Sequence, residues 1–442
     1  MRTHLPRSAL AAISLAFAFA ATRASADKPP GPWTGRNVRV IGYSETEGRP
    51  PFKLAIQEVG GRWLLYMGHL WDRGWSIMDV TNPRDPRVVK FIPGPANTWT
   101  IQMDVEEGKM VTALERIAPG WGGDPAKPFD EGVITWSLAD PVNPGRLGQF
   151  KTGGSGTHRD GYFGGKYVHL AAGMPGYSGN IYVIIDISNP KNPIEAGRWW
   201  VPGQWVAGGE KPAPGVSLHG PPYVEGNLAY VPFGAAGLVI LDVSDPAHIK
   251  KVGQLPFTPP FLGNIGAHSA LPLPKRNLAI VNSESIREDC NEPLNHASVV
   301  DVSNPATPTL VALLPLPVPP SGLPYKDFCH KGGRFGPHNV NHHHHSPFTD
   351  HSDTLVYLTY FNAGLRIYDI SNATLPKEVA WFIPPDPVHR YGPQPVGSLV
   401  EQTEDVLVDS RGYIYVSNKN QGLWILKLDR DGDGEHQGGD RN

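Results

Sequence analysis

One short sequence unit recurs through most of this chain of 442 residues and limits the folds that are open to it. Its clearest copy is GLVILDVSDP at Gly237–Pro246: a glycine, an apolar and partly β-branched run, and an Asp-containing turn closed by proline. The run Leu238–Leu241 has the composition of a strand buried on both faces. Asp242 and Ser244 can hydrogen-bond the amides of a turn. The unit therefore predicts a short strand that ends in a tight turn.

Seven copies of this unit follow one another at similar intervals. Equivalent positions are separated by 58, 49, 56, 59, 68 and 58 residues, which leaves room for about four short strands in each module. These positions are Asp79, Ser137, Asp186, Asp242, Asp301, Asp369 and Lys427. A single module cannot bury both of its faces, so the modules must stack on one another. Seven modules in a compact chain predict a closed β-propeller.

The two ends of the chain complement each other. The last module runs out after its third strand at Asp429, and a spare strand, Val38–Tyr43 (VRVIGY), matches the fourth-strand type of the other modules. Pairing the two ends removes both exposed edges. We therefore predict an all-β fold, a seven-bladed propeller over residues 27–428 whose ring is closed by the N-terminal strand.

The segment Leu238–Pro246 (LVILDVSDP) resembles the repeat of the LVIVD-repeat β-propeller family. The resemblance extends over nearly the whole chain after residue 26 and implies the propeller fold. It implies little about function, because that family includes surface-anchored proteins and proteins regarded as binding modules.

The N-terminal segment has the pattern of a secretory signal. Within residues 1–26, arginines precede an apolar run that is too short to span a membrane, and Ala24–Ala26 forms an A-x-A cleavage site. Removing Arg2, Arg7 and Arg23 lowers the formal net charge of -3 by three, to -6. We expect an exported protein, periplasmic or secreted, with no membrane span and no nucleic-acid partner.

The C-terminal segment, residues 429–442, is acidic and rich in glycine. Asp429–Asp440 (DRDGDGEHQGGD) imitates the acid spacing of a calcium loop, but no flanking helix is predicted. We expect a flexible tail that binds calcium weakly at most.

The two cysteines, Cys290 and Cys329, lie in long insertions of an exported chain. The compartment favours a disulfide that joins the two loops. A pair of thiolate metal ligands is the alternative, although neither cysteine belongs to a C-x-x-C pair.

Histidines recur at one position of the first strand in four successive modules. They are His158, His219, His268 and His338, and Glu404 falls at the corresponding place in the last module. First strands line the centre of a propeller, so these side chains should converge on its axis. Imidazole is a common ligand of zinc, copper and non-haem iron. We expect one such metal per chain, held by these four residues, although a repeat can also copy a histidine that merely packs well. The arrangement resembles that of the carotenoid-cleaving oxygenases, in constellation only.

Three polar side chains near the expected metal are candidates for the chemistry: Arg159, Asp160 and Glu404. The long insertions 283–296 and 315–336 are expected to cover the site as binding loops. The run His342–His345 is interpreted as a surface feature, because consecutive strand residues point to alternate faces and cannot all bind one ion.

Two functions remain open. The first is a metal-dependent enzyme, with oxidation favoured over hydrolysis, lyase or isomerase chemistry, acting on a small organic or aromatic substrate. The second is a non-catalytic propeller that binds a protein or glycan partner. The oligomeric state is not encoded.

Overall fold

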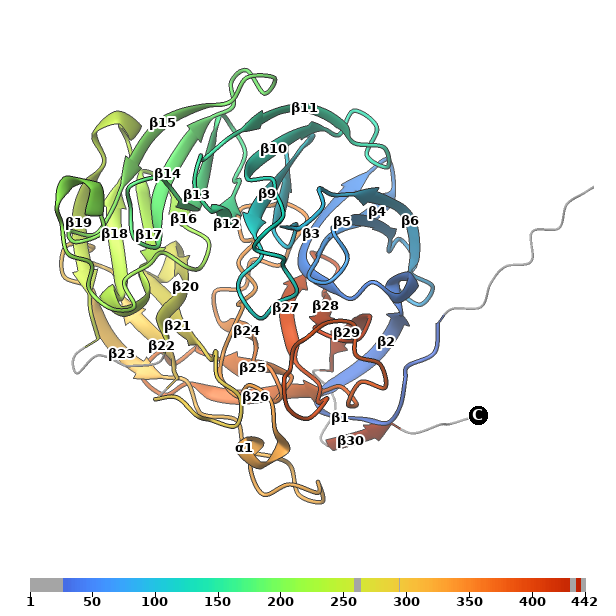
Figure 1. Cartoon of the computed structure of the whole chain (residues 1–442). Coiled ribbons are helices and arrows are strands. Elements are labelled where there is room, and N and C mark those ends of the chain that lie inside the picture. Colours follow the sequence, from blue (N-terminus) through green and yellow to red (C-terminus); the bar gives the residue numbers. More distant parts are fainter. Residues whose placement is uncertain (1–26, 258–263, 294, 430–434, 439–442) are drawn as a thin grey trace, which may run out of the picture.

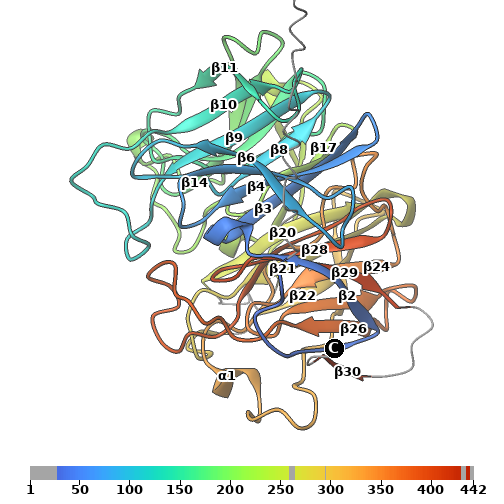
Figure 2. The ribbon, with the colours of Figure 1, turned by 90° about the vertical axis from the view of Figure 1, so that its right-hand side faces the viewer.

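The computed structural model describes residues 27–257, 264–293, 295–429 and 435–438, the last range for its backbone only. The predicted signal segment lies outside the described residues. The strands form small antiparallel sheets that follow one another in chain order around a common centre (Figure 1). Turned by 90°, the molecule shows the sheets stacked beside each other (Figure 2). This is the all-β arrangement of a propeller.

The sheets repeat one four-stranded plan, in which the strand order follows the chain. The first three units consist of β3 (Pro51–Val59), β4 (Arg62–His69), β5 (Gly74–Asp79) and β6 (Arg87–Pro93); β8 (Met103–Glu106), β9 (Lys109–Arg116), β10 (Gly132–Ser137) and β11 (Gly145–Phe150); and β12 (Gly156–Gly161), β13 (Tyr167–Gly173), β14 (Asn180–Asp186) and β15 (Ile194–Trp199). The short strand β7 (Thr98–Trp99) pairs with β9, and the pair Gly156–Glu115 links the second and third units.

The next two units consist of β16 (Tyr223–Glu225), β17 (Leu228–Pro232), β18 (Leu238–Asp242) and β19 (Lys250–Leu255); and β20 (Ile265–Leu273), β21 (Leu278–Glu284), β22 (Ala297–Asp301) and β23 (Thr309–Leu313). Among the described residues, helix is limited to one turn, α1 (Phe328–Lys331), and to short 3-10 segments at Thr46–Gly48, Val206–Gly208, Gly234–Ala236, Pro246–His248 and Pro274–Arg276. No helix in the described part of the chain has the length and apolar character that a membrane crossing requires.

The last two units draw on both ends of the chain. They contain β24 (Leu355–Thr359), β25 (Leu365–Asp369) and β26 (Lys377–Ile383); and β27 (Thr403–Val408), β28 (Tyr413–Asn418) and β29 (Leu423–Leu428). The N-terminal β2 (Val38–Ser44) pairs with β29 as the fourth strand of the last unit. The preceding β1 (Trp33–Arg36) pairs with β26 and with β30 (Glu435–Gly438). Four residues of the expected tail are therefore in a strand.

The recurring Asp and Gly of the sequence unit have direct structural roles. Oδ1 of Asp242 accepts the backbone N–H of Ser244 at 2.9 Å, and Asp186, Asp301 and Asp369 make the same bond two residues ahead. These bonds end the third strand of each unit in a tight turn. At Gly237 φ is +80°, and a Cβ would lie 2.1 Å from the carbonyl oxygen of Leu255 on the neighbouring strand. Only glycine fits there.

Adjacent sheets are held together by apolar clusters. The cluster between the sixth and seventh units includes Val38 and Tyr43 of β2, Ile367 and Trp424. Another cluster joins the first unit to the last through residues such as Leu54 and Ile425. Each fully buried Val, Leu or Ile side chain contributes about 1.5–3 kcal/mol. Burial of both faces of each sheet is therefore the main stabilising contribution.

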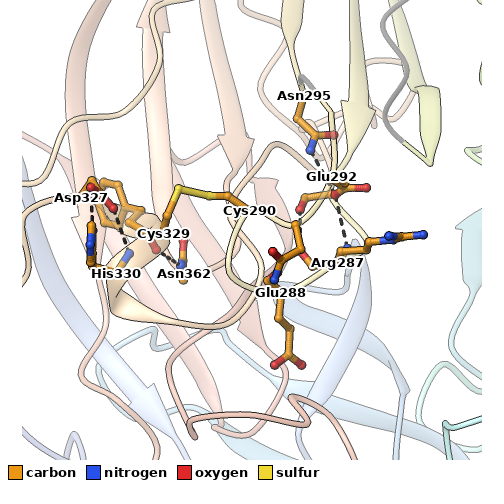
Figure 3. Close-up of a disulfide and its surroundings, with 12 residues drawn as sticks. Arg287, Glu288, Cys290, Glu292, Asn295, Asp327, Cys329, His330 and Asn362 are labelled. Carbon is orange, nitrogen blue, oxygen red and sulfur yellow. Dashed lines mark hydrogen bonds and ion pairs between the residues drawn. A yellow bond between two sulfur atoms is a disulfide. The ribbon is translucent and has the colours of Figure 1, made fainter.

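The two long insertions are joined by the disulfide Cys290–Cys329, which confirms the predicted bridge (Figure 3). Cys290 lies in the loop after β21, and Cys329 lies in α1. The backbone N–H of Asp289 also donates to the carbonyl of Gly333 at 2.8 Å. The bridge and this bond hold the two insertions against each other.

We expect the Cys290→Ser, Cys329→Ser variant to lose about 4 kcal/mol of unfolding free energy, because the closed loop spans 39 residues. Urea denaturation of the oxidised wild type and the variant measures this loss. Reduced wild type is the control and should match the variant. Equal midpoints for oxidised wild type and variant would contradict the prediction.

Val38 tests the contribution of β2. It is fully buried between the last two units, whereas its neighbour Arg39 is exposed. We expect Val38→Ala to cost about 2 kcal/mol of unfolding free energy through the cavity that it leaves. Arg39→Ala, on the same strand, should change it by less than about 0.5 kcal/mol. Equal effects in urea denaturation would show that β2 adds little to the ring.

Candidate functional site

A cavity of about 290 Å³ opens among the inner strands and the loops beside them. Its apolar wall comes from Phe52, Leu70, Trp99, Ile101, Ala118, Trp121 and Ile286. Its polar wall comes from Glu115, His158, Arg159, Asn180, His219, Glu284, Arg334, His338 and Glu404. An aromatic wall facing a charged one suits an organic ligand that carries a polar group.

The structure brings the four repeated histidines side by side. The ring centroids of His158 and His219 are 4.2 Å apart, those of His219 and His268 are 5.3 Å apart, and those of His268 and His338 are 4.9 Å apart. Each comes from a different unit: His158 lies on β12, His268 lies on β20, and His219 precedes β16 by four residues. The backbone N–H of His338 donates to the carbonyl of Thr359 on β24 at 2.9 Å. His158, His219 and His338 line the cavity, whereas His268 has no exposed surface.

Three of these rings have their Nδ1 atoms held by hydrogen-bond partners. Nδ1 of His158 is 2.7 Å from Glu115 Oε2, and Nδ1 of His338 is 3.2 Å from Glu404 Oε2. Nδ1 of His268 is 2.8 Å from Ser269 Oγ, whose hydroxyl donates to the carbonyl of His338. These acceptors place a proton on Nδ1 and leave the Nε2 lone pair free to bind.

The Nε2 atoms surround the carboxylate of Glu284. Its Oε2 lies 3.0 Å from His219 Nε2 and 3.5 Å from His268 Nε2, and its Oε1 lies 3.7 Å from His338 Nε2. Nε2 of His158 is 3.1 Å from Nε2 of His219. Ligand atoms of His219, His268 and Glu284 all fall within 4.8 Å of one another. Nitrogen and oxygen donors at these separations can share one metal ion.

Three cations balance three carboxylates around the cavity. Arg334 Nη1 donates to Glu284 Oε1 at 3.1 Å, and Lys419 Nζ lies 3.0 Å from Glu404 Oε1. Nη2 of Arg159 lies 3.0 Å from His268 Nε2 and 3.4 Å from His338 Nε2. The third carboxylate is Glu115. The site therefore has no large excess of either charge.

Burial determines the proton states of this site. It lowers the pKa of His219 to about 4 and that of Lys419 to about 8. Burial alone would raise the pKa of Glu284, but His338 and His219 outweigh it and hold that pKa well below its usual range. At neutral pH the site thus contains a neutral His219 beside an ionised Glu284.

Three charged residues of the site were not named from the sequence: Glu115, Arg334 and Lys419. Glu284 was expected near the site only as one of several polar residues of the insertion 283–296, without a specific role. Glu115 and Glu284 lie at the ends of the second strands of their units, and Lys419 follows β28 directly. In the sequence these strands read VTALER, LAIVNSE and YIYVSNK, apolar runs that end in a charge. The sequence signal for Glu115, Glu284 and Lys419 is therefore a charged residue at the end of an apolar strand.

The remaining candidates are placed differently. Arg159 and Glu404 line the cavity, but Asp160 is absent from its lining and is buried elsewhere. The interpretation of His342–His345 as a surface run is wrong: His342 and His343 are buried, and His344 and His345 are half-buried. Of the two insertions, Glu284, Ile286 and Arg334 reach the cavity wall.

Arg334 and Glu284 form a buried ion pair that can be tested directly. We expect Arg334→Met to cost about 3 kcal/mol of unfolding free energy, because it leaves Glu284 buried without its guanidinium partner. Adding Glu284→Gln should recover part of that loss. Urea denaturation of the two single variants and the double variant measures the coupling. Strict additivity would contradict the pairing.

Comparison with known proteins agrees with the fold. The family model of the LVIVD repeat matches residues 165–200, 223–255, 295–313 and 352–382. The chain is similar to a protein of known structure from Lactobacillus plantarum, with a TM-score of 0.51 and 11% identity over 83% of this chain and 87% of that chain. It is also similar to the β-propeller domain of Cps50 (Swd1) from Myceliophteria thermophila, with a TM-score of 0.52 and 11% identity over 88% and 99% of the two chains. At this identity the likeness concerns the fold alone. A search of curated proteins found no match.

Proposed function

We propose that this β-propeller with LVIVD repeats is an exported metalloprotein that binds one iron, copper or zinc ion through Nε2 of His158, His219, His268 and His338. The cavity beside the ion then accepts a small organic or aromatic substrate, and oxidation is the favoured reaction. One observation carries the proposal: the Nε2 atoms of His219, His268 and His338 lie within 3.7 Å of Glu284, and Nε2 of His158 lies 3.1 Å from Nε2 of His219. The Nδ1 atoms of three of the rings are held by Glu115, Ser269 and Glu404. Carboxylate–histidine pairs of this kind orient metal ligands.

The separations in the site suit a metal. Two nitrogen ligands about 2.0–2.1 Å from one ion, at cis or tetrahedral angles, lie roughly 2.9–3.4 Å apart. Nε2 of His158 and Nε2 of His219 are 3.1 Å apart. Four imidazoles leave positions open on a five- or six-coordinate iron or copper, whereas they nearly saturate zinc.

Arg159 must move for all four histidines to bind. Its Nη2 lies within hydrogen-bond distance of Nε2 of His268 and of His338, the atoms that would bind the metal. Its Nη1 donates to Asn339 Oδ1 at 3.3 Å. A guanidinium that turns toward the cavity can bind a carboxylate or oxyanion of the substrate, often with two parallel bonds. We assign that positioning role to Arg159.

Glu404 and Glu284 have separate roles in this proposal. Glu404 forms ion pairs with His338 and Lys419, which lower its pKa against the effect of burial, so it orients a metal ligand and stays ionised. Glu284 supplies negative charge at the centre of the Nε2 atoms and can act as a further ligand. When bound, a redox metal supplies electron transfer, and zinc supplies Lewis acidity. Asp160, which does not line the cavity, is not assigned a catalytic role.

The architecture that we propose for this protein is a ring of seven blades closed by β2, with the N-terminal segment directing export. It is supported by the repeated sheet units among the described residues, by the pairing of β2 with β29, and by the apolar cluster between the first and last units. The export proposal rests on the arginine-flanked apolar run and the A-x-A site.

A second function is a non-catalytic propeller that binds a protein or glycan on the same face. It is favoured by the fact that His158, His219 and His268 all have hydrogen-bond partners within the protein itself. In that case the polar network has a packing role only, as buried polar groups require partners.

Metal content separates these two functions. Mature protein purified without a nickel column should contain about one equivalent of iron, copper or zinc per chain at the axial site, and the His219→Ala, His268→Ala variant should lose it. His248→Ala is the control, because that histidine is exposed and distant from the cavity. Elemental analysis of the folded variants gives the answer. Identical metal content in the wild type and the double variant would contradict the metalloprotein proposal and support the non-catalytic binding propeller.

Glu115 provides a finer test. We expect Glu115→Gln to weaken metal binding about 10–100-fold, because His158 loses the carboxylate that orients it. Competition with a coloured chelator measures the affinity. Glu225→Gln, at an exposed position outside the cavity, should leave it unchanged. An unchanged affinity in Glu115→Gln would remove His158 from the ligand set.

A further inference from the structure

A second cluster of buried titratable side chains lies near the axis, apart from the cavity. Asp104 is on β8, Asp160 is on β12, and His342 and His343 follow the bridge that Val340 makes with Leu358. Each of the four is at most 6% exposed, and none of them lines the cavity. Ligand atoms of Asp104, His342 and His343 lie within 4.8 Å of one another. The cluster therefore joins segments more than 200 residues apart in the chain.

Several atoms of this cluster lack a hydrogen-bond partner among the described residues. They are both carboxylate oxygens of Asp160, Oδ1 of Asp104 and Nε2 of His343. Asp160 is 3% exposed, so these oxygens have little access to bulk water. Folded proteins leave few buried polar atoms in this state, because each one costs free energy. A cation bound between the ligand atoms of Asp104, His342 and His343, which lie within 4.8 Å of one another, would lower that cost.

Nearby cations do not satisfy these atoms. Lys53 Nζ bonds His342 Nε2 at 3.0 Å and lies 3.5 Å from Asp405 Oδ2. Lys53 and Arg159 interact with Asp160 only through space, without a hydrogen bond. Asp104 Oδ2 accepts the backbone N–H of Tyr162, and its Oδ1 is 3.7 Å from His343 Nδ1. The charge of Asp104 also acts on Asp160, so the two buried carboxylates are neighbours in the fold.

We propose that Asp104, Asp160, His342 and His343 form a second metal site, for a divalent transition ion such as zinc, that is structural and independent of the axial histidines. Mixed imidazole and carboxylate donors favour zinc and similar ions over calcium, which takes oxygen ligands. Four protein ligands and no contact with the cavity are typical of a closed structural site.

Lys53 can release His342 to such an ion. Asp405 Oδ1 has no hydrogen-bond partner among the described residues, and Lys53 already lies near the other oxygen of that carboxylate. If Lys53 bonds Asp405 alone, Nε2 of His342 becomes available. The ion would then link the second and third units to the segment before β24, across the centre of the ring, and should raise the thermal stability of the protein.

The test uses zinc as the probe. Mature full-length protein is stripped with a chelator and titrated calorimetrically, and bound zinc is counted by elemental analysis after gel filtration. The His219→Ala, His268→Ala variant isolates the second cluster from the axial site. We expect one equivalent of zinc in that background and a rise in the melting temperature on binding. Adding Asp160→Asn, or separately His343→Gln, should abolish both.

His344→Ala is the matched control, because His344 belongs to the same run but not to the cluster. This variant should still bind one equivalent of zinc, and its melting temperature should still rise on binding. Asp160→Asn removes a buried negative charge without changing side-chain shape, so it should fold, and circular dichroism checks this. Cobalt in place of zinc should give a visible absorption spectrum in the His219→Ala, His268→Ala protein.

Three outcomes overturn the proposal. In the first, the axial double variant binds no zinc. In the second, zinc binding survives both Asp160→Asn and His343→Gln. In the third, zinc binding is lost in His344→Ala. If the axial histidines do not bind a metal, the result is different, because the wild type then binds the same amount of zinc as the axial double variant. Two equivalents in wild type and one in each single-site knockout support both sites.

Discussion

Burial of two apolar faces on every sheet is the constraint from which the rest of this structure follows. A four-stranded sheet such as β16–β19 is apolar on both sides, so it needs a neighbour on each side. The first and last units meet through their own apolar cluster, and β2 completes the last sheet from the other end of the chain. A closed ring is the arrangement that leaves no such face in water.

The inner strands of the propeller lie around a common centre, and this has a consequence for polar residues. Space at the axis is limited, so side chains from several units become mutual neighbours although they are far apart in the chain. Glu284, for example, contacts histidines from three other positions and Arg334. Buried charges of this kind are stable only when they are paired. The balance of three carboxylates and three cations around the cavity satisfies that requirement.

The two clusters near the axis differ in how completely they are satisfied. Around the cavity, most carboxylate oxygens have a basic partner within 4 Å. Oε2 of Glu284 and Oε1 of Glu404 lack a hydrogen bond but have such a basic partner. In the second cluster, the oxygens of Asp160 have neither a hydrogen-bond partner nor an ion-pair partner among the described residues. A bound cation would remove that difference. This contrast is the physical basis for treating the second cluster as a site in its own right.

Local features were readable from the sequence, and features made by distant contacts were not. The third strands and their turns were predictable because the bond between Asp242 and Ser244 spans two residues. The disulfide was predictable because the chain has two cysteines and a predicted export signal. The equivalence of the four histidines followed from the repeat. The burial of His342 and His343 and the central place of Glu284 depend on contacts with segments far away in the chain, such as that between His343 and Asp104. The repeat by itself determined the strands, their order and which residues would approach the axis. Only the tertiary structure decided which of them touch, because neighbours at the centre of a propeller are set by how its units pack together.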